Sequence, residues 1–221
     1  MERKIIKTED GSTTIHLVDW GECYHSKNGA IQEAYHVFIN NGLSLVKEKS
    51  VSILEMGFGT GLNAFVTLLE SEQNDLTIDY VGIEAYPISD EEIQSLNYVE
   101  QLNAEKFKDE FSLMHNSEWG VKTKITENFT LTKRKRLFQD IDDLNQYDIV
   151  YFDAFGYPFQ PELWSEAIFV KMFNSIKEKG ILVTYAARGV IKRAMQHAGF
   201  QVKKVPGPPG KREMFIAFKN F

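Results

Sequence analysis

The most restrictive feature of the sequence is the stretch at residues 52–63, which reads SILEMGFGTGLN. It begins as a short apolar strand, passes through the acidic residue Glu55, and then places three glycines on alternate positions. Apolar residues follow at helical spacing from Leu62, which predicts an amphipathic helix. A glycine-rich turn lets a ligand approach the backbone and the free N–H groups of the helix N-terminus. The stretch therefore predicts a ligand site at the end of a buried strand.

The spacing of the glycines indicates which ligand is bound. The pattern E-x-G-x-G-x-G differs from the G-x-G-x-x-G that holds a dinucleotide pyrophosphate. It resembles motif I of class I S-adenosylmethionine (SAM) methyltransferases, in which the backbone passes under a ligand that has no phosphate. Alone, the triplet fits a simple tight turn equally well. The next predicted strand ends in Glu84, about 20 residues downstream, where nucleotide folds place a ribose-binding acid. Together the two features predict nucleoside binding.

Strands and helices are predicted to alternate from residue 51 onward. Such alternation, with acids at strand ends, predicts a doubly wound α/β sheet that binds its ligand beyond the carboxyl ends of the strands. A closing hairpin would give the antiparallel last strand that separates a methyltransferase sheet from an all-parallel dehydrogenase sheet. One helix is predicted to start at Pro161 and end at Gly180, with Trp164 on its apolar stripe. The predicted strands are residues 51–56, 76–84, 121–126, 129–135, 147–153, 181–185, 201–205 and 213–218.

Residues 1–48 are predicted to be a hairpin and helix extension that packs on the catalytic domain, residues 49–221. Asp10-Gly11, between two short strands, is a hairpin signal. A polar turn then leads into a helix that passes through Glu33 and closes at Asn41-Gly42. Because this segment precedes the nucleotide fold, we expect it to cover the ligand or to shape the substrate entrance.

Composition narrows the class of protein. The chain of 221 residues is 43% hydrophobic and 25% charged, as in ordinary globular proteins. The single cysteine, Cys23, excludes an internal disulfide framework and is compatible with a reducing compartment. No apolar run approaches the roughly 20 residues that a membrane helix needs, and no signal sequence is evident. The five histidines show no metal-ligand spacing. We expect a cytoplasmic protein with no membrane segment and no metal.

The charge distribution leaves the question of a nucleic-acid partner open. The net charge of −6 argues weakly against such a partner. The basic residues nevertheless concentrate in the second half of the chain, while residues 90–118 are acidic. A folded chain could therefore present a basic face, although scattered solvated lysines fit the sequence equally well.

Six motifs occur in order along the chain. They are YHS-x-x-GA-x-x-E-x-x-HVF at residues 24–38, GFGTGLN at 57–63, E-x-x-P at 84–87, FDAF at 152–155, PELW at 161–164 and GKREM at 210–214. In this order they resemble the MnmC family, and specifically the methyltransferase component of that bifunctional tRNA wobble-uridine modification enzyme. The flavin-dependent oxidase half has no counterpart in the sequence, so the resemblance is to a stand-alone methyltransferase, with a separate oxidase as a partner.

The resemblance implies a reaction. SAM would methylate the exocyclic amine of 5-aminomethyl-(2-thio)uridine at the wobble position of tRNA, giving 5-methylaminomethyl-(2-thio)uridine, and the partner would be the tRNA anticodon region. One departure is the loop at residues 155–161, FGYPFQP, where the family has F-A-P-x-x-N-P. We expect this loop to border the acceptor pocket. Two alternatives are a SAM-fold transferase for a small amine, such as a polyamine, and a non-catalytic SAM- or RNA-binding protein.

Asp153 is the candidate catalytic residue, and it would also contact the cofactor. A primary alkylamine is mostly protonated at neutral pH, by analogy with lysine, and only the neutral amine can attack the methyl sulfonium. A carboxylate at the pocket could hold the amine and help it to lose its proton. The alternative is an aspartate that caps the segment after its strand.

The remaining candidates surround the cofactor and the acceptor. Glu84 is expected to bind the ribose hydroxyls, and Asp140 to face the adenine amine or cap its loop. Glu55 would act through water on the amino-acid part of SAM, or would be structural. Phe155 would stack on the uridine or form a pocket wall. The other predicted cofactor contacts are Tyr24, Asn28, Gly29, Glu33, Gly57, Gly59, Gly61 and Asn63; Lys211 and Arg212 would contact phosphate or be solvated.

Overall fold

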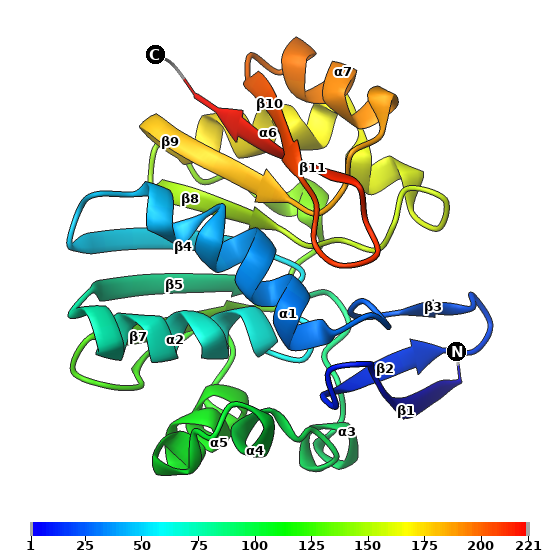
Figure 1. Cartoon of the computed structure of the whole chain (residues 1–221). Helices are drawn as coiled ribbons and strands as arrows, with labels where there is room; N and C mark the ends of the chain where they lie inside the picture. The colour runs from blue at the N-terminus through cyan, green and yellow to red at the C-terminus, as the bar shows by residue number, and fades with distance from the viewer. Residues whose placement is uncertain (1, 220–221) are drawn as a thin grey trace.

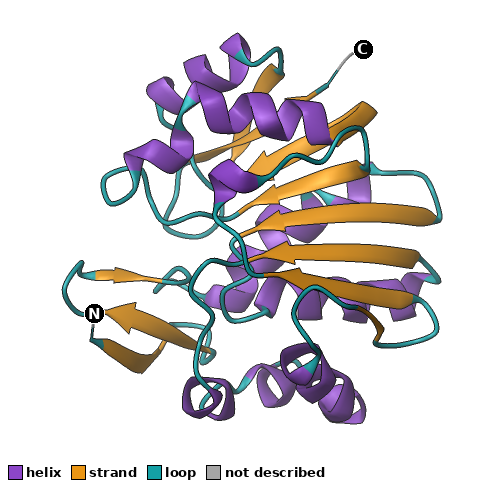
Figure 2. Ribbon diagram, turned by 180° about the vertical axis from the view of Figure 1, so that it is seen from behind, coloured by secondary structure: helices purple, strands orange, loops and turns teal. Residues whose placement is uncertain are grey.

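The structure, a computed structural model, describes residues 2–219 (Figure 1). Its centre is a sheet with the strand order β10-β11-β9-β8-β4-β5-β7-β6, and a separate small sheet has the order β1-β2-β3. Helices cover both faces of the large sheet (Figures 1 and 2). The strands of the large sheet are β4 (Ser50–Met56), β5 (Thr77–Ile83), β6 (Lys122–Lys124), β7 (Phe129–Arg134), β8 (Tyr147–Phe152), β9 (Ile176–Thr184), β10 (Gln201–Pro206) and β11 (Glu213–Phe218).

The strand directions confirm the predicted fold class. Strand β4 is parallel to both of its neighbours, β5 and β8, and the parallel run continues to β7 on one side and β9 on the other. Strand β11 is antiparallel to β9 and to β10, which is the antiparallel last strand expected from the terminal hairpin. The carboxyl ends of the central parallel strands therefore meet at one edge.

The central strands are apolar because both of their faces are covered, as is usual in parallel sheets. Ile53 of β4 belongs to the core under helix α2 (Leu62–Asn74), whereas its neighbour Leu54 belongs to the core under α6 (Glu166–Ser175) and α7 (Gly189–His197). Both side chains are completely buried. Alternate residues of one strand thus face two different cores, which fixes the register of the sheet.

The predicted helix from Pro161 to Gly180 is wrong at both ends. A short 3₁₀ helix, η5 (Pro161–Trp164), is separated from α6 by Ser165, whose φ and ψ of −76° and 160° are extended. The chain enters β9 directly after α6, so Gly180 lies inside a strand. A Cβ there would lie 2.7 Å from the carbonyl oxygen of Asp148. Gly180 is therefore required by close strand packing and not by a helix end.

Several other elements are shorter or more divided than predicted. The N-terminal helix is α1 (Ala30–Ala34) followed by a π-helical turn, η1 (Tyr35–Asn40), and then η2 (Leu43–Leu45). Helix α3 (Asp90–Gln94) starts with a capping box, in which the side chains of Ser89 and Glu92 each accept a hydrogen bond from the other's backbone N–H group. The remaining small elements are α4 (Tyr98–Gln101), η3 (Glu105–Phe107), α5 (Lys108–Asn116) and η4 (Phe138–Asp140).

The N-terminal strands form a small antiparallel sheet of β1 (Arg3–Lys7), β2 (Thr13–Leu17) and β3 (Glu22–Cys23). Figures 1 and 2 both place this sheet beyond the carboxyl ends of the parallel strands. The side chain of Asn97 accepts hydrogen bonds from the backbone N–H and hydroxyl of Thr13, which attaches the small sheet to the main body.

The division at residues 48 and 49 stays a prediction, and residues 1 and 220–221 of the two expected parts lie outside the described residues. Within residues 2–219, no helix combines the length and apolar character needed to cross a bilayer.

Candidate active site

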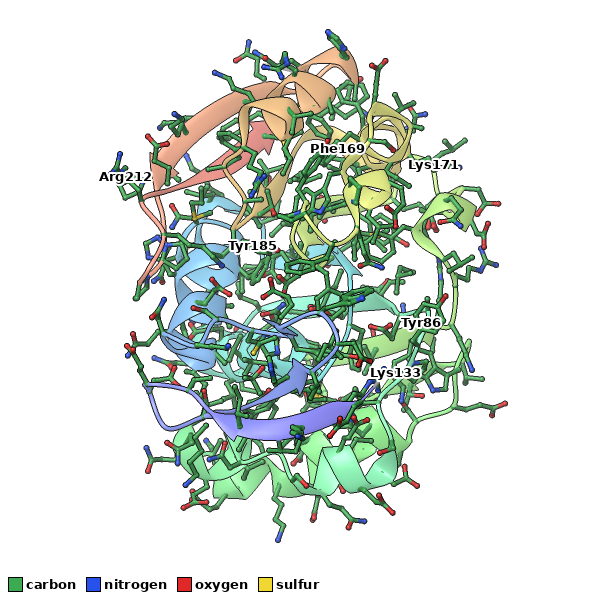
Figure 3. All side chains as sticks on the ribbon, turned by 90° about the vertical axis from the view of Figure 1, so that its right-hand side faces the viewer. Tyr86, Lys133, Phe169, Lys171, Tyr185 and Arg212 are labelled. Atoms are coloured by element: carbon green, nitrogen blue, oxygen red, sulfur yellow. The ribbon has the colours of Figure 1, made fainter. Side chains whose placement is uncertain are left out.

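A cavity of about 670 Å³ lies beyond the carboxyl ends of the central strands. Figure 3 looks onto this edge and labels two of the lining residues, Tyr86 and Tyr185, on different sides of the region. The wall combines the N-terminal extension, the glycine turn, the ends of β5 and β8, and the loop before β11. Its residues include Tyr24, Glu33, Gly57, Gly59, Glu84, Phe138, Gln139, Asp153, Phe155, Tyr185 and Lys211.

The glycine turn has the backbone conformation that its sequence predicts. Gly57, Gly59 and Gly61 all have positive φ values, of 99°, 50° and 72°. A Cβ at Gly57 would lie 2.5 Å from the carbonyl oxygen of Asp153. The turn can therefore pass against the end of β8 only because it lacks side chains. Gly57 and Gly59 line the cavity, whereas Gly61 packs below it against Phe58.

Glu84 follows the last residue of β5 and faces the glycine turn. Its Oε2 accepts a hydrogen bond of 3.0 Å from the backbone N–H of Gly59. Its Oε1 accepts one of 2.8 Å from the N–H of Tyr86. Each carboxylate oxygen keeps a lone pair for a further donor. An orientated acid on the cavity wall is suited to bind the hydroxyls of a ribose.

Asp153 lies at the end of β8 and is joined to Asn63 of helix α2. The Asn63 side-chain nitrogen donates to Asp153 Oδ2 at 2.8 Å and to Glu55 Oε1 at 2.9 Å. Burial, followed by the negative charge of Glu33, raises the pKa of Asp153 to about 7, against the hydrogen bond from Asn63 and the charge of Lys211. Asp153 can therefore exchange a proton near neutral pH.

Glu55 does not line the cavity. It is completely buried behind Asn63, and burial raises its pKa well above the usual range. Its Oε2 has no hydrogen-bond partner within the described part of the chain. Glu55 therefore contacts Asn63 and not the cavity. At this position it does not make the expected contact, through water, with the amino-acid part of SAM.

Lys211, from the loop between β10 and β11, points into the cavity. Its ammonium forms an ion pair with Glu33 of α1 and lies 3.8 Å from the centre of the Tyr185 ring. The Tyr185 hydroxyl in turn donates to the carbonyl of Ala154 at 2.9 Å. The ion pair between Lys211 and Glu33 joins the N-terminal extension to the last hairpin across the cavity wall.

Phe155 forms an aromatic wall. Its ring meets the edge of Tyr24 at a centroid distance of 5.1 Å and that of Trp20 at 5.7 Å. The Trp164 indole donates to the Phe155 carbonyl at 2.8 Å, which fixes the loop after Asp153 from below. Phe155 is thus held at the cavity, and its contact with the acceptor stays a prediction.

The structure does not place Asp140 at the cavity. It is exposed at the end of η4, and the lining residues of that turn are Phe138 and Gln139. The prediction selected the acidic residue of the turn, but its two predecessors line the cavity, and of the three only Phe138 is buried. The prediction that Asp140 lies beside the cofactor therefore does not fit this structure, in which Phe138 and Gln139 line the cavity instead.

Three further predicted contacts lie outside the lining of this cavity. Gly29 precedes α1, where a Cβ would lie 2.8 Å from Asp10 Oδ2. Asn28 packs against Gly210, and a Cβ at Gly210 would lie 1.8 Å from the Asn28 amide nitrogen. Arg212 lines a second, smaller cavity. Asn28 and Gly29 therefore pack within the protein next to the cavity residues Ser26, Lys27 and Glu33, and do not line the cavity themselves.

Sequence reasoning missed Tyr185, Phe138 and Gln139. Tyr185 follows the last residue of β9, so a polar aromatic residue at a strand end was a usable signal. Phe138 and Gln139 carried no signal, because their orientation depends on the 3₁₀ turn.

Three features define a class I SAM-dependent methyltransferase. They are the strand order of the sheet, the glycine turn that lacks the pattern of a dinucleotide pyrophosphate site, and the acid after β5. A sequence model of a family described as S-adenosyl-L-methionine-dependent methyltransferase matches residues 99–220, more than half of the chain. The chain belongs to this family and uses SAM as its methyl donor. Gly57 and Gly59 line the cavity without side chains, so a ligand there can lie against the backbone.

Similar proteins show which methyltransferases this chain resembles in particular, and they are MnmC proteins. The tRNA 5-methylaminomethyl-2-thiouridine biosynthesis bifunctional protein MnmC of Burkholderia mallei (strain SAVP1) is 29% identical over 96% of this chain and 34% of its own length. The MnmC of Burkholderia multivorans is also 29% identical, over 89% of this chain and 32% of its own length. The chain thus spans about a third of these curated relatives.

Solved structures agree with this similarity. The crystal structure of MNMC2 from Aquifex Aeolicus has a TM-score of 0.76 and 27% identity, covering 98% of this chain and 70% of that one. Spermidine synthase from Thermotoga Maritima has a TM-score of 0.59 at 11% identity, covering 98% of this chain and 68% of that one. The second likeness shows the fold alone. The resemblance to MnmC expected from the six motifs is confirmed.

Proposed function

We propose that this methyltransferase transfers a methyl group from SAM to the exocyclic amine of 5-aminomethyl-(2-thio)uridine at the wobble position of tRNA, giving 5-methylaminomethyl-(2-thio)uridine. The names of the MnmC relatives supply the acceptor. The observation that carries the proposal is Asp153, a carboxylate at the cavity wall whose pKa is raised to about 7.

Asp153 suits an amine acceptor, which must lose a proton before it reacts, better than an acceptor that is already neutral. The acceptor arrives mainly as an ammonium, by analogy with lysine, whose pKa is about 10.4. The ionised Asp153 first holds this cation and then takes its proton, leaving a lone pair on nitrogen. A bound SAM supplies an electrophilic methyl group on sulfonium. Asp153 and the Phe155 wall hold the amine for in-line attack, and positioning provides much of the rate enhancement.

Other wall residues hold the two substrates. Gly57 and Gly59 allow the cofactor to lie against the backbone, Glu84 accepts from the ribose hydroxyls, and Phe138 and Gln139 flank the adenine. Tyr24 and Glu33 come from the N-terminal extension and close the opposite side of the cavity. The role of this extension is to cover the bound substrates.

The partner in this proposal is the anticodon region of tRNA. Arg212 is exposed on the same loop as Lys211, where it can reach a phosphate. Lys211 itself is used for Glu33 and Tyr185, so it contributes to the acceptor pocket. A separate oxidase that supplies the aminomethyl precursor follows from the resemblance to MnmC and remains a prediction. The cytoplasmic location expected from the composition also remains a prediction.

The deciding experiment is methyl transfer from labelled SAM to bulk tRNA from cells that lack this protein, followed by nucleoside analysis. Conversion of 5-aminomethyl- to 5-methylaminomethyluridine supports the proposal. SAM binding without incorporation into tRNA, but with methylation of a polyamine, would replace the acceptor by a small amine. SAM binding without turnover on any acceptor would leave a non-catalytic binding protein.

A further inference from the structure

A second cavity, of about 460 Å³, adjoins the first. Glu22, Gly156, Tyr185 and Lys211 line both, so the two cavities share a wall. The far side of the second cavity is formed by the loop after Phe155 and by the start of α7. This loop departs from the MnmC pattern. Its residues Tyr157, Pro158 and Phe159 line only the second cavity, whereas Gly156 lines both cavities.

Aromatic and guanidinium groups meet in this second cavity. The Arg188 guanidinium carbon lies 5.8 Å from the centre of the Tyr157 ring. Phe159 stacks on Trp20 with a centroid distance of 6.1 Å and an interplanar angle of 16°, which holds its ring in place. A flat π-system beside a guanidinium is the arrangement on which unpaired bases stack.

The charge of the second cavity is positive once its internal pairs are counted. Arg188 and Arg212 are both exposed, and neither lies within ion-pair distance of a carboxylate in the described part of the chain. Of the two acids on the wall, Glu213 is paired with Lys204 at 3.0 Å. The other acid, Glu22, offsets one of the two guanidinium charges, so the cavity keeps a net positive charge. Guanidinium is the side-chain group best suited to bind phosphate.

We propose that this second cavity binds the nucleotide next to the acceptor uridine, with its base beside Tyr157 and its phosphate at Arg188 and Arg212. The inference rests on the proposed function, because it needs an acceptor that is part of an RNA chain. A neighbouring nucleotide is covalently linked to the acceptor, and the second cavity is the adjoining space that has both an aromatic surface and free positive charge. A free amine would have no group to place there.

The test compares an acceptor within an RNA chain with the same acceptor nucleoside alone. One is an anticodon stem-loop RNA carrying 5-aminomethyluridine, and the other is the free 5-aminomethyluridine nucleoside. Tyr157→Ala and Arg188→Ala should each raise KM for the RNA at least about fivefold, the lower end of what losing one stacked base or one charged contact costs. Both variants should methylate the free nucleoside as the wild type does.

Two controls separate this role from a structural one. Tyr157→Phe keeps the ring and should keep the wild-type KM for RNA. Lys108→Ala removes an exposed positive charge from α5, away from both cavities, and should leave both acceptors unaffected. Equal losses on RNA and nucleoside would show that the loop only shapes the acceptor pocket, and unchanged kinetics on both would leave the second cavity without a role; either result overturns the inference.

If the proposed function is wrong, the kinetic test gives a result that differs from those above. The wild type would then methylate neither acceptor, although it binds SAM. Fluorescence anisotropy of the labelled stem-loop still decides the inference in that case, because it measures RNA binding without turnover. Weaker binding by Tyr157→Ala and Arg188→Ala, but not by Lys108→Ala, supports the second cavity as an RNA site, and equal binding by all four proteins overturns it.

Discussion

The side-chain nitrogen of Asn63 lies 2.8 Å from Oδ2 of Asp153. Both hydrogens of this amide are in use, because the same nitrogen donates to Glu55. The buried Glu55 therefore determines which end of the amide faces Asp153. A rotated amide would present its oxygen to the carboxylate and disfavour the ionised form that accepts the proton.

Asp153→Asn should bind SAM normally and lose methyl transfer by about 10²–10⁴-fold, the usual contribution of a general base. The substitution keeps the size of the side chain and removes only its ability to take a proton. Calorimetry of SAM binding and single-turnover methyl transfer measure the two properties separately. Turnover within a factor of a few of the wild type would reject the assigned role.

The pH dependence of kcat/KM should show an acidic limb near pH 7, because the ionised Asp153 is the active form and its pKa is raised to about 7. Asn63→Ala removes a donor that favours the ionised form, so its limb should move to higher pH. Glu55→Leu should move the limb in the same direction by freeing the amide, whereas Glu55→Gln keeps an acceptor and should not. A limb that stays in place in Asn63→Ala would contradict this connection.

The contribution of Asp153 to stability should depend on pH in the opposite sense to its contribution to activity. Folding raises the pKa of Asp153 above its value in the unfolded chain, from 3.8 to about 7, so the folded state binds more protons between these two values. The contribution of Asp153 to stability therefore falls as the pH rises through that window. Asp153→Asn removes this penalty, and its Tm should exceed that of the wild type more at pH 8 than at pH 4. Thermal melts at the two pH values provide the measurement.

Glu84→Ala should weaken SAM binding by about 10–100-fold, which corresponds to the roughly 1.5–3 kcal/mol of hydrogen bonds to a charged group. Asp140→Ala is the matched control, since it removes an acid that the sequence had also assigned to the cofactor but that is exposed on η4. Isothermal titration of both variants would test the placement. Equal losses in the two would mean that η4 turns inward when SAM binds.

Gly57→Ala should destabilise the fold and abolish SAM binding. The new Cβ would lie 2.5 Å from the Asp153 carbonyl, in a residue with φ of 99°. Gly120→Ala has a similar φ of 85° but no atom within 4 Å of its Cβ, so it isolates the backbone cost of about 1–2 kcal/mol. A Gly57→Ala protein that melts with Gly120→Ala and still binds SAM would contradict the close packing.

The sequence was sufficient for those parts of the fold that depend on local pattern. Apolar runs marked β4 and β8, alternate glycines marked the turn, and acids after strands marked Glu84 and Asp153. It failed where tertiary packing decided the outcome. The helical stripe after Pro161 continued through Ile176, but pairing of Ile176 with Tyr147 places that residue in β9.

The type of site was predictable from the sequence, but several residues of the cavity wall were not. An acid at a strand end is a local signal, whereas the inward turn of Phe138 depends on a 3₁₀ geometry that its sequence does not reveal. The role of Lys211 was also misjudged, because a lysine in a Gly/Pro loop suggests solvent or phosphate. Its partner, Glu33, is 178 positions away in the chain, and no local pattern reports such a pairing.

The ion pair between Glu33 and Lys211 also sets the order in which the protein can become functional during its synthesis. Glu33 emerges from the ribosome early, and the strands that carry Glu84 and Asp153 follow, but the cavity wall stays incomplete until Lys211 has been made. A nascent chain that ends before the last hairpin would contain every residue of the glycine turn and still lack a closed cofactor site. Cofactor binding should therefore appear only after the hairpin of β10 and β11 has been made.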